Sequence, residues 1–384
     1  MSILLLRTNL DFQPEEFSSS LRAKNFISAI KLFGRKNKIV VLSHRGRPNL
    51  SRKLSLNPFV KPISDSLGYP LAVGHPLAVK KAVKKPVYFI DVKKVGFIKT
   101  KNQIKNSANG SVFLLENLRF FPGEEKNSRG LAKNLASLGD IYINDDFASS
   151  HRKHASLVAI TEFLPCFAGP SLMREINALG KVLKKTKKPF VVIVGGIKIL
   201  DKLQIIQNFI RRANFVLTGG GVANTFLKAK NIDIGNSLFE KLMVKKAGSL
   251  INSSLGRKKI ILPLDFKKEK NRNLDIGPKT IKKYAEIIKE ARTIIWAGPM
   301  GYIEDKRFIK GTKTIIKEII KSRAFSIIGG GETTSVMPKI KNQKSKVFIS
   351  AGGGAMLEYL AGKKMPAIEA LRKNGKIFTY KNKK

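Results

Sequence analysis

The chain has 384 residues, 43% of them hydrophobic, with 31 Gly, 16 Pro and a single cysteine, Cys166. This composition excludes a disordered, collagen-like or low-complexity protein, and one cysteine excludes a disulfide framework or a cysteine-rich zinc site. Lys and Arg number 73 against 27 Asp and Glu, so the net charge is +46. Such a charge attracts polyanions, but no basic tail or single segment carries it, which favours a solvated basic surface over nucleic-acid binding.

The length predicts two domains at roughly 150 residues per domain. No apolar run approaches the length of a membrane span, and the N-terminal run MSILLLRTNL is short and interrupted by Arg7. We therefore expect a soluble, cytoplasmic, globular protein.

Strands in the N-terminal half are predicted within 2–11, 38–48, 111–121 and 140–154, and each apolar run ends in polar or basic residues. Ligands of open α/β sheets bind beyond the carboxyl ends of the strands, so these residues are expected to form a pocket for an anion. The candidates are Arg22, His44, Arg47, Arg119 and Arg152. Metal binding by His151 and His154 is disfavoured, because no partners stand at ligand spacing, and no nucleophile for covalent catalysis stands out.

A strand, a Gly cluster and a helix follow one another four times in the C-terminal half, starting at 190–196, 215–221, 325–331 and 347–354. A further strand, 293–301, ends in a Gly-Pro turn. Continuous apolar runs predict strands covered on both faces, hence a parallel sheet. The two halves meet near 164–189, where a helix is predicted over about 171–184.

Gly clusters before helices let backbone N–H groups approach a phosphate, although such glycines also serve steric needs alone. The usual P-loop and dinucleotide fingerprints are absent. Lys198 and Lys202, one turn apart, suit an anion between them, or a solvated surface. Glu332 could ligate Mg²⁺ or oppose a helix dipole, and Glu304 could bind ribose hydroxyls.

Ten segments, in order along nearly the whole chain, together resemble the phosphoglycerate kinase family. They are LLLRTNLD, VVLSHRGRP, FLLENLRFFPGEEKN, YINDDFASSHRKHAS, FVVIVGGIKILDK, LTGGGVANTFL, LDIGPKT, IIWAGPMGYIE, IIGGGETTS and ISAGGGAMLEYLAGKKMPAIEAL. The resemblance implies two Rossmann-like α/β domains, each a parallel sheet with helices on both faces, facing across a hinged cleft. It also implies a monomer that transfers a phosphoryl group between 1,3-bisphosphoglycerate and ADP, giving 3-phosphoglycerate and ATP in glycolysis, with Mg²⁺ on the nucleotide.

The resemblance also implies domain boundaries. The phosphoglycerate-binding domain is expected over 1–168, an interdomain helix and hinge over 169–189, and the nucleotide-binding domain over 190–363. A C-terminal segment, 364–384, could return to the N-terminal domain.

Site residues carried over from the resemblance fall on both domains. On the substrate side they are Asn9, Asp11, Arg22, His44, Arg47, Arg119 and Arg152. On the nucleotide side they are Lys198, Lys202, Glu304, Gly330, Gly331, Glu332, Thr333, Gly352, Gly353 and Gly354, with Glu332 as the metal ligand. Arg22 and Lys198 are the expected catalytic residues, which would meet the transferring phosphoryl group.

Four departures from the family pattern fall at these sites. Asp-Leu-Asn of the family is Asn9-Leu10-Asp11 here, and its Asn and Thr are replaced by Ala297 and Ala351. Its Asp is replaced by Glu332, which can still ligate Mg²⁺. We expect weakened or retuned activity. The alternatives are a catalytically weakened homologue that binds nucleotides, polyanions or nucleic acid, and a kinase for another carboxylic acid, which rests only on the exchange at Asn9 and Asp11.

Overall fold

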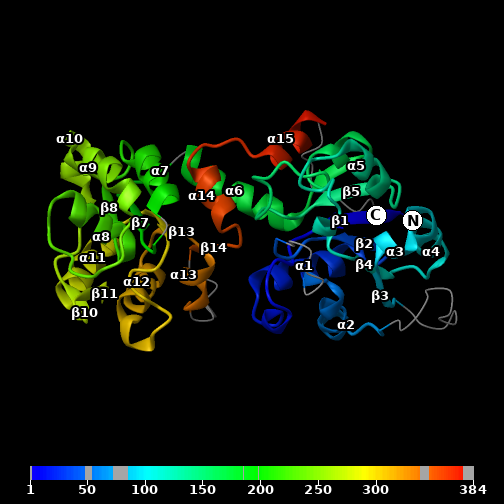
Figure 1. The fold of residues 1–384 in the computed structure, drawn as a ribbon, viewed down its shortest axis with the longest axis horizontal. Coiled ribbons are helices and arrows are strands. Elements are labelled where there is room, and N and C mark those ends of the chain that lie inside the picture. Colours follow the sequence, from blue (N-terminus) through cyan, green and yellow to red (C-terminus); the bar gives the residue numbers. More distant parts are fainter. Residues whose placement is uncertain are drawn as a thin grey trace. The chain divides into compact units, whose positions relative to one another are not determined.

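The computed structural model describes residues 2–47, 54–71, 85–184, 186–197, 199–337 and 346–374, and leaves the side chains of Asp201, Glu332 and Thr334 undescribed. The chain forms two compact units (Figure 1). One comprises Met1–Glu175 and the segment that begins at Lys364, and the other is Ile176–Lys363. The division between them falls inside helix α6 (Pro170–Lys184).

The first unit is built on a six-stranded parallel sheet with the order β3-β4-β2-β1-β5-β6. Its strands are β1 (Ile3–Arg7), β2 (Lys38–Leu42), β3 (Val87–Ile90), β4 (Val112–Leu115), β5 (Ile141–Asn144) and β6 (Cys166–Ala168). Its helices are α1 (Leu21–Phe33), α2 (Val60–Leu67), α3 (Val92–Val95), α4 (Phe97–Asn106), α5 (Arg129–Ala136) and α15 (Pro366–Lys373), with short 3-10 turns that include η5 (Ala159–Glu162).

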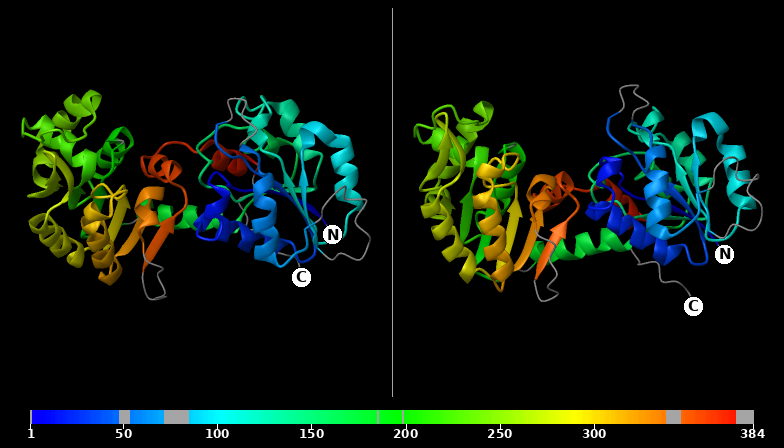
Figure 2. Two further views of the ribbon diagram at one scale, coloured as in Figure 1. Left: turned by 60° about the horizontal axis from the view of Figure 1, so that its bottom comes forward. Right: turned by 90° about the horizontal axis from the view of Figure 1, so that it is seen from below.

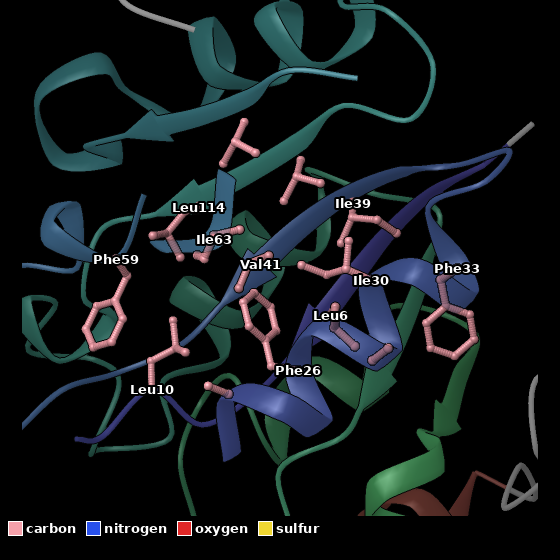
Figure 3. Close-up of a cluster of buried hydrophobic side chains, with 14 of the residues drawn as sticks. Leu6, Leu10, Phe26, Ile30, Phe33, Ile39, Val41, Phe59, Ile63 and Leu114 are labelled. Atoms are coloured by element: carbon pink, nitrogen blue, oxygen red, sulfur yellow. The ribbon is translucent and has the colours of Figure 1, made fainter. Parts of the chain in front are cut away.

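Consecutive apolar residues bury this sheet on both faces. Leu4, Leu5 and Leu6 of β1 are all fully buried, and neighbours along a strand point to opposite faces. Figure 3 shows one of the two resulting layers, in which Phe26 and Ile30 of α1 pack on the sheet. This double coverage is what the unbroken apolar runs predict.

The second unit repeats the plan with the strand order β14-β13-β12-β7-β8-β9, all parallel. Its strands are β7 (Phe190–Val194), β8 (Phe215–Thr218), β9 (Ile260–Ile261), β12 (Thr293–Ala297), β13 (Phe325–Gly329) and β14 (Val347–Ser350), and β10 (Phe266–Glu269) and β11 (Arg272–Ile276) form a separate antiparallel hairpin. Its helices are α7 (Ile199–Phe209), α8 (Gly220–Ala229), α9 (Val244–Asn252), α10 (Ser254–Lys259), α11 (Pro278–Glu290), α12 (Lys310–Lys321), α13 (Gly331–Ser335) and α14 (Gly354–Leu360).

Helices α11 and α12, yellow to gold in Figure 2, cover one face of this second sheet. Tyr284 and Ile288 of α11 and Ile315 of α12 pack with Ile294 and Trp296 of β12 in one buried cluster. The expected α/β fold with two parallel sheets is therefore confirmed. No helix in the described ranges is long and apolar enough to cross a membrane.

Strands β3, β6 and β9 and the β10–β11 hairpin were not among the strands predicted from sequence. The segment that carries β6 contains Pro165, Gly169 and Pro170, which favour a chain break. It nevertheless adds an edge strand beside β5, pairing Tyr142 with Cys166. Tertiary pairing outweighs local propensity in this segment.

Candidate active site

Arg7, the last residue of β1, ties together the carboxyl ends of three neighbouring strands. Its guanidinium is fully buried and lies 3.0 Å from Asp146 Oδ2, just past β5. Its Nη2 donates to His44 Nδ1 beyond β2 at 2.9 Å, and its Nε donates to Ser156 Oγ at 2.9 Å. The sequence analysis did not single out Arg7 as a site residue, because an arginine inside an apolar run reads as an interruption of that run.

His44 is held neutral in one tautomer. Burial lowers the pKa of this imidazole well below its ordinary value, and the nearby cations Arg7, Arg152 and Arg22 lower it further. An arginine only donates hydrogen bonds, so Nδ1 of His44 must accept, and the ring proton sits on Nε2. Nε2 lies 3.8 Å from Asp11 Oδ2. His44 is therefore poised as a neutral donor at the edge of the sheet.

Asn9 and Asp11 follow β1 and organise the neighbouring loops. Asn9 Oδ1 accepts from Arg22 Nη1 at 3.1 Å, and its Nδ2 donates to Asp146 Oδ1 at 3.3 Å and to Ser149 Oγ at 3.1 Å. Arg22 Nη1 also donates to the carbonyl oxygen of Asp11 at 3.0 Å. Asp11 Oδ1 accepts from the backbone N–H of Gly46 at 2.7 Å, which joins the loops after β1 and β2.

Arg119 is a cation whose donors are only partly used by the protein. Its side chain is 2% exposed; Nη1 donates to the carbonyl oxygen of Gly46, and Nε lies 3.2 Å from Glu125 Oε1. Nη2 is buried and finds no hydrogen-bond partner in the described structure. Because a buried unpaired donor is costly, this nitrogen marks a place where an anionic ligand would be stabilised.

The remaining predicted cations differ in position. Arg152 is half-buried, its Nε donates to His151 Nε2 at 3.3 Å, and its charge depresses the pKa of His44. Arg47 is exposed. His154 is buried 3.8 Å from Glu124, and burial is the main cause that lowers its pKa to about 4. Among the described residues no group of three His, Cys, Asp or Glu side chains could hold a metal ion.

In the second unit, glycine turns after neighbouring strands interlock through backbone hydrogen bonds. Gly195 N–H donates to the carbonyl oxygen of Ala297 at 2.9 Å, and Gly196 N–H to that of Pro299 at 2.8 Å. A Cβ on Gly195 would lie 2.1 Å from the Pro299 oxygen, and Gly298 has φ +88°. Side chains are excluded from these turns by contact as well as by backbone conformation.

A pocket that opens to solvent lies beside these turns. It is lined by Gly196, Ile197, Gly220, Gly221, Asn224, Leu238, Arg272, Asn273, Leu274, Pro299, Gly301, Tyr302 and Glu304. Of the predicted nucleotide-side residues that the structure describes, Glu304 lies on this lining. Asn224 and Asn273 were missed by the sequence analysis; they hydrogen-bond each other at 3.1 Å across α8 and β11, which no local pattern reveals.

The two other predicted glycine turns follow the adjacent strands β13 and β14, which pair Gly329 with Ser350. Gly330 has φ +101°, and the Thr333 hydroxyl in α13 is buried with no hydrogen-bond partner in the described structure. After β14, Gly352 N–H donates to Ser350 Oγ at 3.1 Å, and Gly353 precedes α14 with φ +50°. Both turns therefore precede helix starts, as the pattern of Gly331 and Gly354 predicts.

The structure gives no side-chain position for two central candidates, Lys198 and Glu332. Lys198 lies outside the described residues, and of Glu332 only its place in α13 is described. Lys202 is half-buried on α7. The roles predicted for Lys198 and Glu332 therefore stay predictions.

Comparison with known proteins identifies the family. The phosphoglycerate kinase family model matches residues 4–363. A phosphoglycerate kinase from Herpetosiphon aurantiacus is 39% identical over 353 residues, covering 87% of this chain and 86% of the relative. One from Francisella tularensis subsp. novicida is 36% identical over 392 residues, covering 95% and 93%.

Solved structures agree. The crystal structure of phosphoglycerate kinase from Pyrococcus horikoshii OT3 matches with a TM-score of 0.83 and 29% identity over 98% of this chain and 97% of that one. The enzyme from Coxiella burnetii matches with a TM-score of 0.76 and 30% identity, covering 97% and 96%. The resemblance inferred from ten segments is confirmed, and none of these matches supports a non-catalytic polyanion-binding protein. This chain belongs to the phosphoglycerate kinase family.

Proposed function

We propose that this chain catalyses reversible phosphoryl transfer between 1,3-bisphosphoglycerate and ADP, giving 3-phosphoglycerate and ATP. Family membership makes it a phosphotransferase of glycolysis. The observation that carries the assignment of the site is the partly unpartnered, buried guanidinium of Arg119, on the same carboxyl sheet edge as His44 and Arg7. Such an edge suits a small phosphorylated carboxylic acid.

The first unit would hold the phosphoglycerate. Arg119 and Arg152 would supply positive charge for its 3-phosphate, and Arg47, whose side chain is exposed, would add to it. His44, neutral with its proton on Nε2, would donate to a substrate oxygen. Asn9 and Asp11 orient Arg22 and the loop at Gly46, which keeps these donors in register.

The second unit would hold the nucleotide. The pocket lined by Gly196, Gly220 and Tyr302 would take the nucleoside, and Glu304, which also lines it, would accept hydrogen bonds from ribose hydroxyls. The starts of α13 and α14, which follow Gly330 and Gly353, would face the phosphates.

Magnesium would enter with the nucleotide as its Mg complex, bound by phosphate oxygens and the Glu332 carboxylate. The donor chemistry fits, because Mg²⁺ commonly takes one or two protein carboxylates beside substrate phosphates and needs no all-protein cage. The ion neutralises phosphate charge when bound.

Transfer itself requires positioning and charge stabilisation rather than a protein nucleophile. Arg22 and Lys198 are the residues proposed to stabilise the transferring phosphoryl group. The two substrates must meet for in-line transfer, so the proposal includes closure of the two domains with exclusion of water.

The test is a coupled assay with 3-phosphoglycerate, MgATP, glyceraldehyde-3-phosphate dehydrogenase and NADH, run beside Lys198→Ala. We expect turnover by the natural chain and a fall in kcat of at least ~10²-fold in the variant, the scale of losing one charge stabiliser. Lys228→Ala, on the surface end of α8, is the control for loss of one lysine. No turnover by a folded natural chain would contradict the proposed reaction, and near-normal turnover by Lys198→Ala would contradict the role of that residue.

A further inference from the structure

Asp146 is a buried carboxylate beside Arg7 and Asn9 in the first unit, and it was not among the site residues predicted from the sequence. It is 1% exposed and lies just past β5. Its Oδ1 accepts from Ser149 N–H at 2.9 Å and from Asn9 Nδ2 at 3.3 Å, while its Oδ2 lies 3.0 Å from Arg7 Nη1. Donors therefore occupy both oxygens, as an ionised carboxylate requires.

Two chains of hydrogen bonds run outward from this carboxylate. Through Arg7, whose Nη2 donates to His44 Nδ1 at 2.9 Å, Asp146 fixes the orientation of the His44 ring. Through Asn9, whose Oδ1 accepts from Arg22 Nη1 at 3.1 Å, it fixes Arg22. One side chain thus holds two proposed substrate-side residues that it does not touch.

The amide at position 9 and the carboxylate at position 146 form one electrostatic unit. Asn9 can donate to Asp146, whereas an aspartate at position 9 would place a second carboxylate about 3.3 Å away in a buried setting. Two like charges so close disfavour joint ionisation. Arg7 already pairs with Asp146 and also acts on the buried carboxylate of Glu124, while the cation that faces position 9 is the half-buried Arg22. A further carboxylate at position 9 would therefore lie against Asp146 without a buried arginine of its own.

We propose that Asp146 is a positioning residue of the phosphoglycerate site, which orients His44 through Arg7 and Arg22 through Asn9. The inference rests on the proposed function of that site. It also accounts for the asparagine at position 9, where the family pattern has an aspartate.

The first experiment measures 3-phosphoglycerate binding by calorimetry, together with KM and kcat, in Asp146→Ala and Asp146→Asn. We expect Asp146→Ala to weaken binding and raise KM at least about tenfold, since a charge-assisted contact is lost behind His44, and to lower kcat as Arg22 is released. Asp146→Asn keeps one acceptor oxygen, so its affinity for 3-phosphoglycerate should lie between those of the natural chain and Asp146→Ala. If Asp146→Ala does not fold, Asp146→Asn tests the proposal in its place. Asp91→Ala, which removes the cap of α3 in the same unit, should lower thermal stability and leave binding unchanged.

The second experiment moves the carboxylate. Asn9→Asp alone should weaken binding, because it adds a second buried negative charge, whereas Asn9→Asp combined with Asp146→Ala returns one carboxylate to the neighbourhood of Arg7. We expect the double variant to bind more tightly than Asp146→Ala, so that the two losses are strongly non-additive. Unchanged binding in a folded Asp146 variant, or simply additive losses, would overturn the proposal. If the natural chain binds 3-phosphoglycerate without turnover, the reaction fails while binding still decides the role of Asp146.

Discussion

The protein satisfies only some of the hydrogen-bond donors of Arg119, and this determines the expected effect of removing its side chain on binding and stability. Its buried Nη2 has no hydrogen-bond partner among the described residues, and in the proposed function the phosphoglycerate would accept from it. We expect Arg119→Ala to raise the KM for 3-phosphoglycerate by about tenfold to a hundredfold, the scale of a charge-assisted hydrogen bond. The midpoint of thermal unfolding should change little, because a costly buried donor leaves with the side chain.

The control is Arg307→Ala, which removes an exposed guanidinium paired with Asp305 and Glu269 in the second unit. It should leave both the KM and the midpoint near their natural values. A large drop in stability with an unchanged KM in Arg119→Ala would show that this residue serves the fold and not the ligand.

His154 makes stability depend on pH. Burial first, then Arg7 and Arg152, lower its pKa to about 4, below the ordinary value near 6.5. Between these values the unfolded chain binds the proton and the folded one does not, so stability falls as the pH drops through this window. Raised carboxyl pKa values, such as that of Asp275 at about 6, act in the opposite direction.

Comparing the natural chain with a variant that lacks this imidazole therefore isolates the contribution of His154 to the pH dependence of stability. Lowering the pH from 7 to 4.5 should shift the stability difference by about 2 kcal/mol in favour of His154→Gln over the natural chain. Urea unfolding at both pH values measures the shift, and an equal pH response of the two proteins would rule out a buried neutral His154.

The sequence predicts the cations at the strand ends because strand periodicity and residue type suffice to place them. It does not predict the buried side chains that hydrogen-bond to these residues and orient them. Arg7 and Asp146 meet through pairing of β1 with β5, 139 positions apart in the chain, and only the assembled sheet brings the two together. Local patterns thus predict the candidate ligand-binding residues, whereas the buried side chains that contact them depend on tertiary structure.

At the scale of elements, the turn after β7, on the proposed nucleotide side, leaves no room for a side chain at Gly195. A Cβ at Gly195 would lie 2.1 Å from the Pro299 carbonyl oxygen. Because this distance is far below van der Waals contact, the turns after β7 and β12 would have to move apart. We expect Gly195→Ala to weaken ADP binding at least about tenfold and to destabilise the protein by about 1–3 kcal/mol, as overpacking does. Calorimetry with MgADP and thermal unfolding measure the two effects.

Gly180 offers the matched control. It lies inside α6, where an added Cβ meets nothing within 4 Å. Alanine favours a helix over glycine by up to about 1 kcal/mol, so Gly180→Ala should stabilise the protein slightly and leave ADP binding alone. Normal ADP binding by Gly195→Ala would contradict the proposal that the turn after β7 lies at the nucleotide site.

The short strands show why element prediction is incomplete. Strand β9 has two residues and β6 has three, too few for any periodicity to register. The longer strands β7, β12 and β13 carry mainly apolar runs that lead into glycine, and these patterns predict both the sheet and the glycine turns at its edge.

At the scale of the whole molecule, helix α15, red in Figure 1, belongs to the first unit although it is the last helix described. It contacts β6 and η5; Ala367 N–H donates to the Ser150 carbonyl oxygen at 3.1 Å, and Asn374 Nδ2 donates to that of Thr161 at 2.9 Å. Its Leu371 is fully buried. The last described helix thus completes the hydrophobic core that the first strands begin.

Leu371→Ala should therefore destabilise the first unit by about 2–5 kcal/mol, the range for truncating a buried leucine. The single tryptophan, Trp296, reports on the second unit alone. In Leu371→Ala, we expect the loss of the far-UV circular dichroism signal to begin at a lower urea concentration than in the natural chain. The urea midpoint reported by tryptophan fluorescence should shift less. Leu242→Ala, at a side chain 85% exposed, should change neither signal, and identical shifts of both signals in Leu371→Ala would refute a separate first unit.

The discontinuous first unit has a consequence for synthesis on the ribosome. The second unit is one uninterrupted stretch, Ile176–Lys363, whereas the first needs residues from Lys364 onward. Translation proceeds from the N-terminus, and domains fold as their residues emerge. The half of the protein that is translated first is therefore finished last: a nascent chain stopped before Lys364 would carry a complete second unit beside a first unit still lacking α15, whose exposed β6 side is then a natural target for chaperones.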